Sequence, residues 1–84
     1  MRILWDEPKR LANLDKHGFD FAALTEEFFS RAMIRPAKGE RYLAIGLLGA
    51  SLVAVVFRPL GAEALSVISM RPANRKEASI DDRT

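Results

Sequence analysis

The chain has 84 residues, of which 49% are hydrophobic and none is cysteine. This length predicts one domain over residues 1–84, and the apolar content supplies a core and excludes wholesale disorder. The absence of cysteine excludes disulfides, thiolate zinc sites and cysteine nucleophiles, and it fits a reducing cytoplasm. The formal net charge is only +2, but between residues 31 and 76 eight arginines and lysines accompany only two glutamates. A basic middle segment indicates an anionic partner for one face, with ordinary solvated surface as the alternative.

The N-terminal third predicts a short strand and then two helices. The apolar residues 3–5 suit a strand or an extended lead-in. Asp6 fits the N-cap of a first helix and Gly18 its C-terminal cap. Asp20 opens a second helix, because the apolar residues over 21–28 recur with the spacing of an amphipathic stripe. We expect the two helices to pack antiparallel as a helical hairpin.

The middle of the chain changes from helical to strand patterns. Proline and glycine predict a loop at residues 36–39. Residues 41–48, 52–57 and 65–70 are rich in aliphatic and β-branched side chains and are separated by turn signals, so they predict an antiparallel meander. We therefore expect a three- to four-stranded antiparallel sheet. The longest apolar stretch, residues 42–57, is too short and too interrupted by glycine to cross a membrane.

The C-terminal segment predicts a helix directly after the last strand. Residues 73–79 suit this helix, and residues 81–84 a frayed tail. Since helices and strands cluster separately, the predicted class is α+β. The junction holds Arg71, Arg75 and Lys76. If the helix begins near Arg71, then Arg71 and Arg75 lie one turn apart and can clamp a phosphate. The alternative is that Arg71 ends a strand and Arg75 is solvated surface.

The residue inventory narrows the possible chemistry. We expect no cofactor and no metal, because the chain has no glycine-rich nucleotide loop and no metal-ligand cluster, and His17 is its only histidine. The remaining groups suit metal-free RNA cleavage, in which the substrate's own 2′-hydroxyl attacks the adjacent phosphorus. Arginine neutralises the charge that builds on the phosphorane oxygens. The general base stays open among His17, Glu40 and Lys16.

Several candidates also have a purely structural interpretation. His17 suits the negative end of a helix dipole without any further role. Trp5 can stack on a base or pack in the core. Glu40 and Arg41 can reach the end of the third meander strand, or they can pair with each other at the surface. Asn13, one turn before His17, can orient that histidine or simply be exposed.

Four segments in this order resemble the BrnT family of type II toxins: WDEPKRLANLDKHGFDF, ERYLAIGLL, VVF and VISMRPANRKE. The resemblance implies a RelE-like fold and a ribonuclease that inhibits translation. It also implies neutralisation by a BrnA-type antitoxin, which contacts the operator DNA on behalf of the pair. For the assembly we expect a homodimer or a 2:2 toxin–antitoxin complex.

Carried over residue by residue, the resemblance points to the "KHG", "ERY" and "SMRPANR" segments. The predicted catalytic residues are those that can move a proton or neutralise a phosphate: His17, Glu40, Arg71 and Arg75. The predicted RNA-binding residues are neighbouring cations and one aromatic ring: Lys16, Arg41, Lys76 and Trp5.

Two features depart from the family pattern. Leu65 and Ser66 stand where many relatives have an arginine, and the C-terminal segment from residue 78 is short and acidic. Both departures remove groups that could touch RNA. The alternative function is therefore a catalytically degenerate toxin that only binds its antitoxin or RNA.

Overall fold

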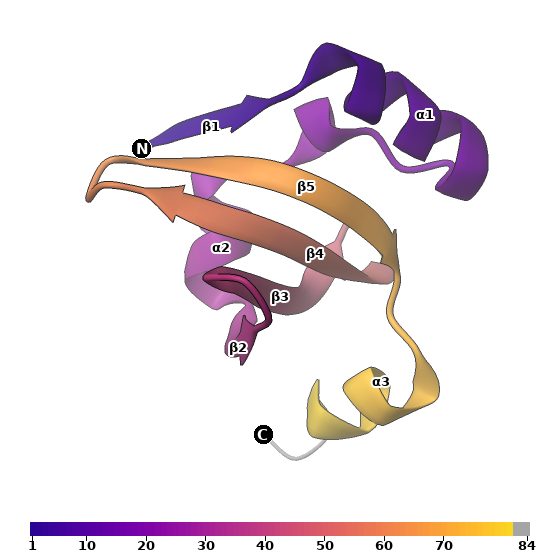
Figure 1. Cartoon of the computed structure of the whole chain (residues 1–84). Coiled ribbons are helices and arrows are strands. Elements are labelled where there is room, and N and C mark those ends of the chain that lie inside the picture. Colours follow the sequence, from indigo (N-terminus) through magenta and orange to yellow (C-terminus); the bar gives the residue numbers. More distant parts are fainter. Residues whose placement is uncertain (82–84) are drawn as a thin grey trace.

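The computed structural model describes residues 1–81, which contain five strands and three α-helices (Figure 1). The strands are β1 Arg2–Trp5, β2 Met33–Ala37, β3 Arg41–Leu48, β4 Ser51–Leu60 and β5 Ala64–Pro72. The helices are α1 Glu7–His17, α2 Glu26–Arg31 and α3 Arg75–Asp81, with a short 3₁₀ helix, η1, over Phe21–Ala23. The α+β class is confirmed. Of the frayed tail predicted over residues 81–84, Asp81 is instead the last residue of α3, and residues 82–84 lie outside the described residues. None of the described helices is long and apolar enough to cross a membrane.

The sheet is mixed, with strand order β1-β5-β4-β3-β2. Strands β2 to β5 pair antiparallel, whereas β1 pairs parallel with β5, with Ile3 opposite Leu65. The prediction of a three- to four-stranded antiparallel sheet is therefore wrong. Part of the loop predicted over residues 36–39 belongs to β2 instead. The strand tolerates Pro36 because it lies at the edge of the sheet, where a residue without an N–H does not interrupt the hydrogen bonding between two strands.

The helices η1 and α2 cover one face of the sheet, and the core lies between these helices and the sheet. Phe28 packs edge-to-face on Phe29, and Phe29 on Phe57, each with ring centroids 5.2 Å apart. A Cβ at Gly46 would lie 3.3 Å from atoms of Phe28 and Ala32, so this glycine lets α2 approach β3 closely. The buried apolar cluster consists of Phe21, Leu24, Phe28, Phe29, Ala44, Val53, Val55, Phe57, Leu65, Val67 and Met70.

The predicted N-terminal helical hairpin is wrong. The Asp20 carboxylate accepts from the Ala22 N–H and caps only η1, which ends at Ala23. Thr25 then caps a separate helix, α2, by accepting from the Phe28 N–H. Helix α1 packs against β5, and helix α2 packs against β3. The two helices therefore pack on the sheet and do not form a hairpin with each other. The apolar stripe that suggested one helix is thus divided between two short ones.

Helix α1 has the predicted caps and is tied to the edge of β5. Asp6 accepts from the Lys9 N–H at 3.2 Å, and Gly18 closes the helix with a φ of 76°. The Asn13 side chain donates to the Met70 carbonyl at 2.8 Å and accepts from the Met70 N–H at 3.0 Å. Asn13 therefore satisfies the backbone of β5 beyond the point where β1 ends, and its amide is engaged by Met70 rather than by His17.

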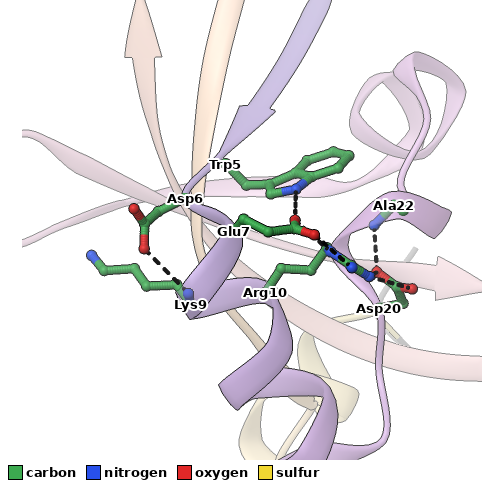
Figure 2. Close-up of polar contacts among 7 residues, drawn as sticks. All are labelled: Trp5, Asp6, Glu7, Lys9, Arg10, Asp20 and Ala22. Carbon is green, nitrogen blue, oxygen red and sulfur yellow. Dashed lines mark hydrogen bonds and ion pairs between the residues drawn. The ribbon is translucent and has the colours of Figure 1, made fainter.

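A second set of polar contacts fixes the start of α1 (Figure 2). The Arg10 guanidinium donates to Glu7 at 2.7 and 2.8 Å and to both carboxylate oxygens of Asp20 at 3.1 Å. The Trp5 indole N–H donates to Glu7 at 3.0 Å. The hydrogen bonds from Arg10, and then from Trp5, lower the pKa of Glu7 to about 2. The carboxylates of Glu7 and Asp20 are therefore already bound by Arg10.

Candidate functional site

Strands β2 to β5 carry four arginines on the sheet face opposite the phenylalanine core. The register aligns two rows across this face from β2 to β5: Arg35, Leu43, Val56 and Ser69 in one, and Met33, Ile45, Ala54 and Arg71 in the other. Arg41 lies two residues before Leu43, and Arg58 two residues after Val56, so strand alternation places both on the same side. We call Arg35, Arg41, Arg58 and Arg71 the arginine face.

Helix α3 covers part of this face and is held there by Glu77. Asn74 and Glu77 form a capping box: the Glu77 N–H donates to the Asn74 side chain at 2.9 Å, and the Asn74 N–H donates to the Glu77 carboxylate at 2.8 Å. The Arg71 guanidinium donates two further bonds to this carboxylate, at 2.8 and 2.9 Å. Only 6% of Glu77 is exposed. The Arg71 bonds keep the pKa of Glu77 below its usual value despite burial, and the charge of Arg35 adds to this effect.

The helical clamp predicted for the junction does not form. Arg71 belongs to β5, and α3 begins only at Arg75, so the two arginines are not one helical turn apart. Arg71 is bound to Glu77, whereas Arg75 and Lys76 are exposed on the first turn of α3. Helix α3 lies below the end of β5 in Figure 1. The structure instead matches the alternative interpretation, in which Arg71 lies at the end of a strand and Arg75 is solvated surface. The spacing of Asn74 and Glu77 was the sequence signal for this helix start.

Glu40 and Arg41 lie where the turn from β2 enters β3. Glu40 is exposed and has a positive φ of 59°, and Arg41 is exposed at the first position of β3. Arg58, on the neighbouring strand, donates weakly to the Gly39 carbonyl at 3.4 Å. The ion pairs found among residues 1–79 include neither Arg41 nor Arg58, and none joins Glu40 to Arg41. Glu40 therefore borders the arginine face at a point where Arg41 and Arg58 make no ion pair with the side chains of residues 1–79.

Lys16 and His17 lie in a separate groove between α1 and β5. The groove has a volume of about 330 Å³. Its lining residues are Lys9, Ala12, Asn13, Lys16, His17, Ile68 and Ser69. Ser69 also belongs to a row of the open face, two residues before Arg71. Five of the predicted site residues thus fall into two groups: Glu40, Arg41 and Arg71 at the arginine face, and Lys16 and His17 in the groove at its β5 border. Arg75 and Lys76 lie apart from both, on α3.

Trp5 belongs to neither group. It pairs with Val67 at the end of β1, its ring packs against the core, and its N–H is bound by Glu7. This placement favours the structural interpretation of Trp5 over a stacking role. Arg35 and Arg58 are the residues of the arginine face that sequence reasoning missed, because only the strand register shows which way they point. Among the described residues, no group of three histidine, aspartate or glutamate side chains could hold a metal ion.

Comparison with known proteins gives a consistent family assignment. Residues 5–77 match the family model for the ribonuclease toxin, BrnT, of type II toxin-antitoxin systems. The crystal structure of the Brucella abortus ribonuclease toxin BrnT is similar to this chain with a TM-score of 0.83 and 54% sequence identity, over 89% of this chain and 99% of that one. A search of curated proteins gave no match. The chain therefore belongs to the BrnT family of ribonuclease toxins, which act in type II toxin–antitoxin systems.

Proposed function

We propose that the arginine face holds the scissile phosphate and that the toxin cleaves RNA without a metal ion. The 2′-oxygen of the RNA bonds to the adjacent phosphorus as the bond from phosphorus to the 5′-oxygen breaks. A base takes the 2′ proton, and the leaving 5′-oxygen gains one. Arg41 and Arg58 neutralise the charge of the phosphorane, because a guanidinium is always ionised and binds two phosphate oxygens at once. The observation that carries this proposal is that both arginines are exposed on neighbouring strands of the open face.

The other predicted residues surround this phosphate position. Proton transfer falls to His17 or Glu40, which lie at two different borders of the face. Arg71 contributes a guanidinium that Glu77 holds in a fixed orientation. The exposed cations Arg75, Lys76 and Lys16 extend the positive surface along which an RNA strand can lie.

The same surface supports the proposed partner. A type II system contains an antitoxin, and we assign a BrnA-type protein whose acidic segment covers the arginine face and so excludes RNA. In this proposal the toxin has a RelE-like fold and forms a homodimer or a 2:2 complex with the antitoxin. It cleaves RNA in the cytoplasm and so inhibits translation. It meets operator DNA only through the antitoxin.

Cleavage products test the proposed reaction. Purified toxin should cut RNA in the presence of EDTA and leave 2′,3′-cyclic phosphate and 5′-hydroxyl ends, since the 2′-hydroxyl is the nucleophile. Mass spectrometry of the fragments reads these ends, and a 2′-deoxy nucleotide at the cut position should block the cut. The degenerate alternative predicts antitoxin or RNA binding without any product. A requirement for added Mg²⁺, or 5′-phosphate ends, would contradict the proposal.

A further inference from the structure

The groove between α1 and β5 gathers three basic side chains on one side of α1. Lys16 and His17 follow Lys9 by seven and eight residues, about two helical turns, so all three lie on one face of α1. Its lining residues include no acidic side chain. None of the ion pairs found among residues 1–79 involves any of the three. This part of the surface is therefore a shallow, open depression lined by two lysines and a histidine.

Two nearby acids, Glu7 and Asp20, are bound by Arg10, whereas Asp6 caps α1 beside Lys9, and the groove is held rigidly. Figure 2 shows Lys9 on the other side of α1 from the contacts among Glu7, Arg10 and Asp20. Those two carboxylates therefore do not neutralise the groove. The two hydrogen bonds between Asn13 and Met70 fix α1 against β5, so the spacing between the helix cations and the strand is preformed.

Ser69 makes the groove continuous with the arginine face. It lines the groove, and it also pairs with Val56 in a row of the open face. Arg71 follows two residues later on the same side of β5, about 7 Å further along the strand. A strand of RNA that crosses the end of β5 therefore passes from one cluster of cations to the other.

We propose that this groove is a second phosphate subsite, which binds the RNA backbone beside the cleaved bond through Lys9, Lys16 and the Ser69 hydroxyl. The inference rests on the proposed function and adds Lys9 and Ser69 to the RNA-binding surface. RNA, and not an acidic protein segment, is the assigned ligand, because Ser69 joins the groove to the face assigned to the scissile phosphate.

The test measures how RNA affinity depends on strand length. The probes are 2′-O-methyl RNAs, which cannot be cut, of about three and about twelve nucleotides. Lys9→Gln should lower the affinity for the long RNA about three- to tenfold and lower the ratio of long to short affinity. The slope of log affinity against log salt should fall by about 0.7, the share of one phosphate contact on a single strand. Lys9→Arg should restore both values, since it keeps the charge.

Arg31→Gln is the matched control, because Arg31 is an exposed cation on α2 that pairs with Glu27 at 3.3 Å. It should leave the affinity and the salt slope unchanged. Wild-type affinity and slope in Lys9→Gln would overturn the subsite, whereas the proposed function would stand if the wild type still cuts RNA in EDTA. A weaker antitoxin complex with unchanged RNA affinity would also overturn it, by making the groove a protein-binding surface. Binding that depends on Lys9 without any cleavage would support the subsite and reject the proposed catalysis.

Discussion

Replacing Arg58 with alanine should slow RNA cleavage roughly ten- to a hundredfold. The guanidinium is free of ion pairs in the described part of the chain, so its loss removes a charge-assisted phosphate contact worth about 1.5–3 kcal/mol in the transition state. Single-turnover cleavage of a labelled RNA measures this rate. Arg58→Lys should recover only part of it, because an ammonium is a point charge and cannot bind two phosphate oxygens as a fork.

The stability of the Arg58 variant should stay near that of the wild type, since the residue is exposed and the side-chain hydrogen bond found for it among residues 1–79, to the Gly39 carbonyl, is long at 3.4 Å. Arg31→Ala is the matched control, because it also removes an exposed arginine but lies on α2, beside the covered face. Cleavage by Arg31→Ala should equal that of the wild type. Wild-type cleavage by Arg58→Ala would remove Arg58 from the site.

Replacing Glu77 with glutamine should lower the free energy of unfolding by about 1.5–3 kcal/mol. Glutamine still suits this position of a capping box, so the change isolates the buried charge that binds Arg71. Because the pKa of Glu77 is lowered in the folded protein, its contribution is complete above pH 4.5, the usual value for the group, and is lost as the pH falls through the folded value. Urea unfolding between neutral and acid pH measures both effects. Equal stability and equal pH dependence in the two proteins would contradict the assignment.

Arg71 carries both structure and function in this account, so its effects must be separated. Arg71→Ala should destabilise the fold as well as slow cleavage, because it leaves the Glu77 carboxylate buried without its main partner. Arg71→Met combined with Glu77→Gln removes both charges, keeps an acceptor for the Asn74 N–H and should regain part of the lost stability. Cleavage should remain slow in this double variant, since the guanidinium is absent. Full cleavage activity in the double variant would mean that Arg71 acts only as a structural residue.

The sequence predicted β3, β4 and β5 well, because long runs of aliphatic and β-branched residues separated by turn signals have few alternatives. The N-terminal elements were harder. The stripe from Phe21 to Phe28 has helical spacing, but Thr25 competes as an N-cap and starts a new helix. Pro36 argued against a strand, yet an edge strand tolerates it. The parallel pairing of β1 with β5 depends on the path of the whole chain, which local patterns do not contain.

The candidate site was only partly predictable for a related reason. Arg41 and Arg71 could be named from their segments, but Arg35 and Arg58 join them only through the register of four strands. Arg71 and Glu77 are six residues apart in the sequence, one on a strand and the other on a helix, so helical spacing could not reveal that they pair. The sequence therefore indicated the type of chemistry, whereas the sheet determines which cations act together.

The central claim is that RNA lies on the arginine face, and a bound-state footprint tests it most directly. Backbone amide signals of the toxin should be recorded by NMR while a short 2′-O-methyl RNA, which cannot be cleaved, is added. Binding of RNA on the arginine face should shift the signals of Arg41, Arg58 and Arg71, together with that of Ser69 at the border of the groove. Shifts confined to α2 and β1, with the open face unchanged, would contradict it.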